Sequence, residues 1–251
     1  MSNILADDLQ LTPLAPFLAS LPVILLCAVI IMVRWEENYG DTGDSVSGSL
    51  LETLNIIISN KTVLRLGIIQ TCAESAMYIF VFLWTPVLDT DDGVKMPLGW
   101  IFSTFMLAIM LGSQISSTLV HLTQQRILNL SLIIMTVSLF ITAVFTNNNL
   151  IINSNINTVI IYISFLSFEA ALGAYFPAIG SLRGEIVPEH CRANVMTWFR
   201  LPLNIITCLV LLSTNFTNIS KSFMFIICSV LCSLGAWVSS KISRSHFIIH
   251  L

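Results

Sequence analysis

Residues 126–146 read RILNLSLIIMTVSLFITAVFT, and Arg126 is the only charged residue among them. Such a run fits a helix that crosses a lipid bilayer, because roughly 20 mostly apolar residues span the hydrocarbon core and a helix satisfies its own backbone hydrogen bonds there. The whole chain shares this character, since 55% of its 251 residues are hydrophobic and 10% are charged. A soluble domain carries about 25% charged residues. We therefore predict an all-α integral membrane protein.

Runs of the same kind occur along the whole chain and predict about seven transmembrane helices. The predicted spans are 14–33, 63–88, 98–120, 126–146, 156–182, 195–213 and 222–240. This pattern divides the chain into an N-terminal part with the first span (1–33), a polar loop (34–62), a six-helix unit (63–240) and a tail (241–251).

The positive charges predict the orientation of these spans. Eight Lys and Arg residues fall at one set of span ends, against Lys95 and Lys221 at the other. Because Lys and Arg accumulate in cytoplasmic loops, we predict an outer N-terminus, a cytosolic loop at 34–62 and a cytosolic C-terminal tail. The glycosylation sequons that begin at Asn215 and Asn218 then fall in the last outer loop, whether or not they are used.

Several classes of function find no support in the sequence. A formal net charge of −3 gives no basic surface for nucleic acid. No nucleotide-binding glycine loop, zinc-ligand spacing or serine elbow occurs, so we do not expect an enzyme. Cys228 and Cys232 share a helix face but have no nearby His or carboxylate, so we expect neither a metal site nor another cofactor.

Two carboxyl groups lie where a membrane should exclude them. Glu74 is near the middle of 63–88, and Glu169 is near the middle of 156–182. An ionisable group at that depth is costly unless it faces a watery cavity or a partner, so each is a hypothesis for a functional site. A carboxyl group can accept and release a proton, which makes both candidates for proton coupling. The alternative is a structural carboxyl that only bonds a neighbouring helix.

Arg200 is a third unusual charge, in the predicted span 195–213. It lies about 9 Å from the inner end at 1.5 Å per residue, shallow enough for its guanidinium group to reach the membrane surface. However, Asn204 follows at i+4 on the same face and Trp198 lies two residues before it. These three residues are therefore candidates for binding a tetrahedral oxyanion, which suits the paired donors of a guanidinium group.

Residues that weaken helices accompany these charges. Gly173 and Pro177 follow Glu169, and Pro202 follows Arg200. We predict helix breaks at these positions, since transporters tend to place their binding sites at interrupted helices near the membrane midplane.

Several segments carry a family resemblance. They are Trp35–Gly40, Leu83–Leu88, Phe102–Met106, Gly173–Pro177, Gly180–Arg183, Pro188–Glu189, Arg192 and Trp198–Asn204. With these segments the chain resembles the molybdate-anion transporter family of the major facilitator superfamily, from about residue 14 onward. One departure is His-Leu-Thr-Gln-Gln-Arg at 121–126, where many facilitators have an Asp-Arg-x-Gly-Arg signature.

The resemblance implies a twelve-span fold of two six-helix halves. This chain would be the C-terminal half with one preceding helix, and about the first five spans would be missing. It also implies uptake of molybdate across the plasma membrane by alternating access, with the spans of Glu74 and Glu169 lining the central cavity. The expected partners are a small oxyanion, membrane lipid and the missing N-terminal half, which would complete the transport path.

Two other functions remain open from the sequence. Seven spans with an outer N-terminus are also the plan of a heptahelical receptor, although the usual outer disulfide and inner Asp-Arg-Tyr-like motif do not occur. A half-transporter could also have lost transport and act as a truncated, non-transporting protein. Molybdate, sulfate and tungstate are all tetrahedral dianions, so the predicted site suits each of them.

Overall fold

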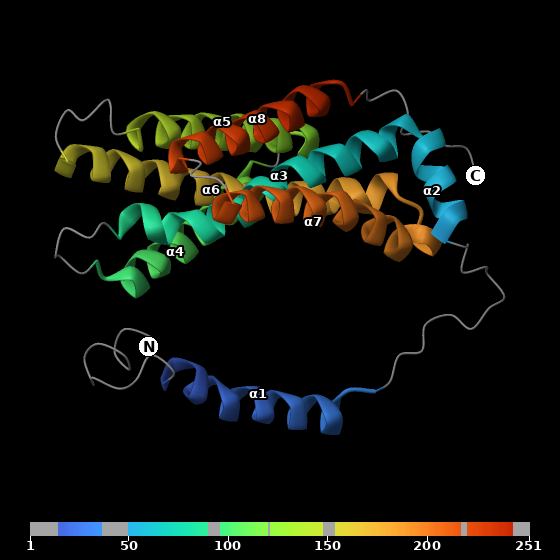
Figure 1. Cartoon of the computed structure of the whole chain (residues 1–251). Helices are drawn as coiled ribbons and strands as arrows, with labels where there is room; N and C mark the ends of the chain where they lie inside the picture. Colours follow the sequence, from blue (N-terminus) through green and yellow to red (C-terminus); the bar gives the residue numbers. More distant parts are fainter. Residues whose placement is uncertain are drawn as a thin grey trace. The chain divides into compact units, whose positions relative to one another are not determined.

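The computed structural model describes residues 15–36, 50–89, 96–119, 121–147, 154–216 and 220–242. Within these ranges the chain is helical and contains no strand, which confirms the all-α prediction. The elements in order are α1 (Ala15–Arg34), α2 (Leu50–Ser59), α3 (Lys61–Leu88), α4 (Leu98–Thr118), α5 (Gln124–Phe145), α6 (Ser154–Ile186), the short 3-10 helix η3 (Glu189–Cys191), α7 (Arg192–Phe216) and α8 (Lys221–Ser240) (Figure 1).

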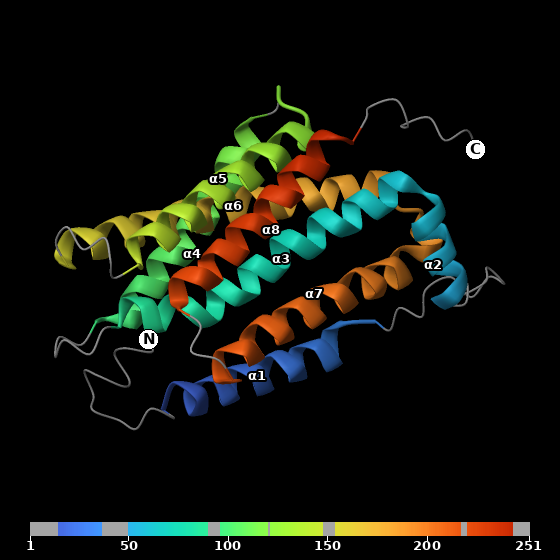
Figure 2. The same ribbon diagram turned by 45° about the horizontal axis from the view of Figure 1, so that its top comes forward.

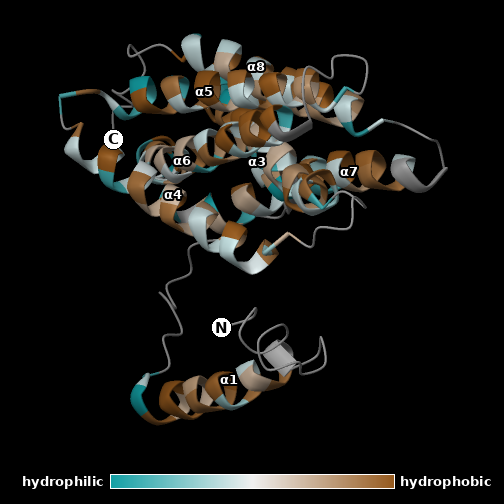
Figure 3. Cartoon of the chain, turned by 90° about the vertical axis from the view of Figure 1, so that its left-hand side faces the viewer, coloured by the Kyte–Doolittle hydropathy of each residue, from teal (hydrophilic) through white to brown (hydrophobic). Residues whose placement is uncertain are grey.

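Six helices, α3 to α8, are long and apolar enough to cross a membrane. They coincide with the last six predicted spans within a few residues, and apolar residues run along them (Figure 3). α1 coincides with the first predicted span, and its residues Leu18–Arg34 form a shorter apolar helix. The seventh crossing therefore stays a prediction.

The described residues fall into two compact units. One contains α1 with Met96–Ser103, and the other contains α2, α3, α5 to α8 and the part of α4 from Thr104 onward. The second unit holds every candidate site residue. Thr217 of the first glycosylation sequon, Asn218 and Ile219 of the second, and most of the C-terminal tail lie outside the described residues.

α2 differs from the prediction that 34–62 is a loop. Its residues Thr53 and Ile57 are buried and lie one turn apart, and the helix packs against α3 and α7. A short helix is stabilised by burying one face, and these two residues supply that face. The predicted loop therefore contains a helix at its end, while residues 37–49 lie outside the described residues.

α3 is the central helix of the larger unit and packs against α2, α6, α7 and α8 (Figure 2). It begins at Asn60, whose side-chain oxygen accepts hydrogen bonds from the backbone nitrogens of Thr62 at 3.0 Å and Val63 at 3.4 Å. An asparagine at this position satisfies amide groups that have no partner inside the helix. The start of the first span in the six-helix unit is thus fixed by a cap.

Two kinds of contact join the helices beside α3. A Cβ atom added at Gly112 on α4 would overlap the carbonyl oxygen of Ala170 on α6, and one at Gly173 on α6 would overlap that of Ile109 on α4. Small residues allow membrane helices to approach this closely. α3 and α7 are joined differently, since the hydroxyl of Thr71 donates to the carbonyl of Phe199 at 3.4 Å.

Candidate functional site

One exposed face of α7 is polar. It is formed by Thr197, Arg200, Asn204 and Cys208, which follow at intervals of three or four residues. Beside it runs an exposed apolar strip, Leu201, Ile205, Leu209 and Leu212. Residues three and four apart share a side of a helix, so the two strips look in neighbouring directions. The apolar strip suits lipid, whereas the polar strip suits a watery cavity or another protein segment.

Glu74 on α3 belongs to a group of charges drawn from three helices. It is half-buried, its carboxylate accepts a hydrogen bond from the side chain of Gln70, and it lies within electrostatic range of Arg183 on α6 and Arg200 on α7. We call Glu74, Arg183 and Arg200 the charge cluster. Two guanidinium groups against one carboxylate leave the cluster with an excess of positive charge, which favours an anion.

Two buried polar groups border the charge cluster. Tyr175 on α6 is 0% exposed and lies within electrostatic range of Glu74 and Arg183. Its hydroxyl has no hydrogen-bond partner among the described residues, and the same holds for the side-chain oxygen of Gln70. Buried polar groups are normally satisfied. These two atoms therefore retain hydrogen-bonding capacity for a water molecule or a ligand.

The sequence identified Glu74 and Arg200 in this group but missed Gln70, Tyr175 and Arg183. Gln70 precedes Glu74 by one turn, which is a signal that could have found it. Arg183 enters the sequence analysis only within the family segment Gly180–Arg183. Its guanidinium Nη1 lies 3.8 Å from the sulfur of Met196 on α7. Contacts of this kind depend on how α6 and α7 pack, which the sequence does not reveal.

Glu169 has different surroundings. It is 5% exposed, and one of its carboxyl oxygens has no partner among the described residues. Arg183 lies 14 residues further along α6, about 21 Å at 1.5 Å per residue. The structure therefore does not bring Glu169 together with the charge cluster.

Aromatic rings pack beside Glu169. The ring of Phe168 lies 4.7 Å from that of Phe80 on α3, measured between centroids, and Phe80 also contacts Phe165 at 5.0 Å. Phe105 on α4 joins this group, since its ring lies 6.2 Å from that of Phe80 and 5.3 Å from that of Trp84 on α3. These residues form an aromatic cluster between α3, α4 and α6, and Phe165 and Phe168 place this cluster on the same part of α6 as Glu169.

Asn204 and Trp198 relate to Arg200 in opposite ways. Asn204 is exposed one turn beyond Arg200 on the polar face of α7. Trp198 is half-buried, and a separation of two residues turns it about 200° around a helix with 3.6 residues per turn. It therefore lies on nearly the opposite side of α7 from Arg200, and helix geometry does not support their joint contact with one ligand.

The predicted helix breaks do not occur. α6 continues through Gly173 and Pro177, and α7 continues through Pro202. A proline inside a helix removes one backbone hydrogen bond, and in a membrane helix neighbouring groups compensate for that loss. A glycine is needed at position 173 because α4 approaches so closely there that a larger side chain would overlap its backbone. The glycine marks a close helix contact and each proline marks a missing backbone hydrogen bond, but neither interrupts its helix.

A multi-pass helical protein with a polar helix face and charges from several spans has the features of a membrane transporter. The model of a family described as sugar transporters with twelve transmembrane spans matches residues 1–169. The chain is 36% identical to the molybdate-anion transporter of Takifugu rubripes over 242 residues, which is 86% of this chain and 49% of that protein. It is 35% identical to the molybdate-anion transporter of Xenopus laevis over 238 residues, 91% of this chain and 50% of that protein.

The chain therefore belongs to the molybdate-anion transporter family of the major facilitator superfamily, which confirms the resemblance seen in the sequence. It spans about half the length of the curated relatives it matches. These relatives are transporters and not enzymes, in agreement with the prediction made from the motifs.

Proposed function

We propose that this chain forms the C-terminal half of a transporter that carries molybdate, or a closely similar tetrahedral oxyanion, across the plasma membrane. The observation that carries the proposal is the position of Arg200, which lies on the polar face of α7 and within electrostatic range of Glu74. The names of the relatives support molybdate as the substrate.

In the proposed site, Arg200 and Asn204 contact the oxyanion. A guanidinium group donates two parallel hydrogen bonds to two oxygens of one anion, and the amide of Asn204 adds a further donor one turn away. Arg183 supplies a second positive charge against the double negative charge of molybdate. Trp198 is a candidate contact on sequence grounds alone. It lies on the other side of α7 from Arg200, so the proposed site does not include it.

Glu74 is the proposed coupling group. Its carboxylate competes with an incoming oxyanion for Arg183 and Arg200, because all three belong to the charge cluster. A proton on Glu74 removes the competing negative charge, so proton uptake and oxyanion binding favour each other. Glu169 is the second candidate, since its carboxyl group has no cationic partner in the part of the chain that the structure describes.

Transport itself requires alternating access to the site from the two sides of the membrane. The polar face of α7 would line one wall of the central cavity, and the N-terminal half of a twelve-span protein would supply the other wall. In the proposed orientation the N-terminus of this chain is outside and the C-terminus is cytosolic.

The test is molybdenum accumulation in cells that lack their own molybdate uptake. The cells express either this chain alone or the chain joined to the five-span N-terminal portion of a relative. Uptake by the joined form alone is the expected result. The proposal fails if neither form accumulates molybdenum while surface labelling finds both in the plasma membrane. If the chain alone lowers uptake by a co-expressed full-length relative, it acts as a non-transporting partner.

A further inference from the structure

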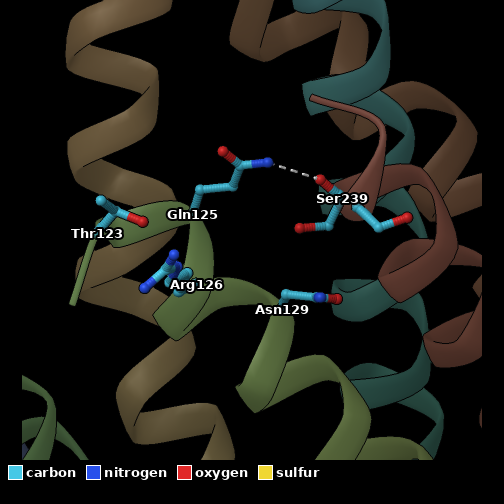
Figure 4. Close-up of a pocket in the computed structure, with 6 residues that line it drawn as sticks. Thr123, Gln125, Arg126, Asn129 and Ser239 are labelled. Carbon is cyan, nitrogen blue, oxygen red and sulfur yellow. Dashed lines mark hydrogen bonds between the residues drawn. The ribbon is translucent and has the colours of Figure 1, made fainter. Parts of the chain in front are cut away.

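A polar pocket of about 250 Å³ lies away from the charge cluster, where α5 begins and α8 ends. Its lining comes from Thr123, Gln125, Arg126, Asn129, Ser239 and Ser240. Figure 4 shows Ser239 across the pocket from the first turns of α5, which carry Gln125 and Asn129. None of the residues that line it is apolar or acidic, and Arg126 is the one charged residue among them.

Carbonyl groups at the end of α8 would repel an anion if they were free, but the neighbouring helices already occupy them. The side-chain nitrogen of Gln125 donates to the carbonyl of Ser239 at 3.2 Å and to that of Ile242 at 2.6 Å. Arg65 on α3 donates to the carbonyl of Lys241 at 2.7 Å. These bonds cover the negative end of α8 and place a second arginine at this end of the bundle.

The pocket retains unused hydrogen-bonding groups. Ser239 is 0% exposed, and its hydroxyl has no partner among the described residues. The hydroxyl of Thr123 also has none, and Thr123 makes no side-chain cap for α5. The first amides of a 22-residue helix carry partial positive charge and bind anions readily. An uncapped helix start and a buried hydroxyl without a partner thus meet in one pocket.

The pocket lies at the level of a membrane surface. It joins the first residues of one candidate span to the last residues of another. Near by, Trp237 is 58% exposed and the ammonium group of Lys241 lies 3.4 Å from the centroid of its ring. Exposed Trp and Lys residues are typical of the boundary between membrane and water. A group that resides at this level is the phosphate of a phospholipid.

We propose that this pocket binds the phosphate group of a phospholipid, with Arg126, Asn129 and the hydroxyl of Ser239 as donors and the start of α5 as the positive end. Free phosphate has the same chemistry and is the other source. A phosphate offers several acceptor oxygens, which matches a lining of hydroxyls, amides and one guanidinium group. This site is separate from the charge cluster and does not depend on transport.

The experiment is native mass spectrometry of the purified chain in detergent, with phosphatidylglycerol or with diacylglycerol of the same acyl chains. Only the first lipid has a phosphate. We expect the chain to retain phosphatidylglycerol in preference to diacylglycerol. Arg126→Gln should lower that retention roughly tenfold, as expected for the loss of a charge-assisted hydrogen bond. Ser239→Ala should lower it about threefold.

Arg34→Gln is the matched control, because it removes a positive charge that does not line the pocket and should leave retention unchanged. Asn129→Ala replaces Arg126→Gln if the latter does not fold. Inorganic phosphate is then added as a competitor: no displacement of lipid assigns the site to the headgroup, and displacement at millimolar concentration assigns it to free phosphate as well. Equal retention of both lipids without binding of inorganic phosphate, or equal losses in the control and the pocket variants, overturns the proposal.

Discussion

Glu74 and Glu169 look alike in the sequence, as single carboxyl groups near the middle of apolar runs, but the structure gives them different surroundings. Glu74 is half-buried among polar groups and lies within electrostatic range of two arginines. Glu169 is buried beside the aromatic cluster and has no charged partner among the described residues. The depth of a charge in a span therefore does not define its role, whereas its neighbours on other helices do.

The largest effect should come from Arg200→Ala. This variant removes one of the two arginines that lie near Glu74, whereas Glu169 has no such partner among the described residues. We expect it to abolish measurable uptake by the joined transporter, a loss of roughly fiftyfold or more, because a charge-assisted pair of hydrogen bonds to the oxyanion is lost. Molybdenum accumulation measures this, with surface labelling as the control for insertion. Thr197→Ala, on the same polar face, should transport normally. Normal uptake by Arg200→Ala would refute the oxyanion role.

Glu74→Gln and Glu169→Gln test the comparison directly, because each keeps the side-chain shape and removes a proton site. Glu74→Gln should reduce the response of uptake to an imposed proton gradient roughly tenfold, within the usual range of coupling energies. Glu169→Gln should retain the response. The measurement is initial uptake with the outside at pH 6 and pH 8, where the wild type takes up more at pH 6. The reverse pattern would assign proton coupling to Glu169.

A smaller effect is expected from Tyr175→Phe, which removes the buried hydroxyl beside the charge cluster. Because this hydroxyl has no partner among the described residues, the free energy of unfolding should change by no more than about 0.5 kcal/mol. If the hydroxyl serves the oxyanion or its water, uptake should fall about threefold. If the free energy of unfolding falls by well above 1 kcal/mol while uptake is unaltered, the hydroxyl has a structural role.

Glu169→Gln should also have only a small effect on stability. The variant leaves the aromatic cluster in place and breaks no ion pair, so the free energy of unfolding should change by about 1 kcal/mol or less. Glu74→Ala is the contrasting variant, because it removes the carboxylate that lies within electrostatic range of two arginines. Thermal unfolding in detergent compares the two, and a larger loss for Glu169→Gln would contradict the assigned surroundings.

Much of the fold could be predicted from the sequence because a membrane imposes a length on its helices. The last six predicted spans match α3 to α8, and the family resemblance proved correct. α2 was missed because a ten-residue helix is too short to span the membrane and is stabilised by contacts with α3 and α7. Its buried face becomes visible only once those neighbours are known.

The candidate site was only partly predictable. Arg200 and Glu74 could be found because charges in apolar runs are rare. Arg183 could not be added, since only the packing of α6 against α3 brings it within electrostatic range of Glu74, and it lies near the end of its own helix. Tyr175 carries no charge that would distinguish it from an ordinary core residue. The predicted break at Gly173 failed because a glycine that permits close contact resembles, in sequence, a glycine that ends a helix.

The close approach of Gly112 to Ala170 and of Gly173 to Ile109 has a consequence for how this chain can change shape. Because the two backbones lie this close, a movement of α4 along α6 would bring Cα atoms against carbonyl groups, so we expect the two helices to move together as one rigid unit. α7 is attached to α3 by long hydroxyl contacts of 3.4 Å, from Thr71 to Phe199 and from Ser75 to Leu203. Such bonds break at low cost, so we expect a shift of α7 against α3 to be limited by the packing of the Phe199 ring on Gly67 and not by these hydrogen bonds.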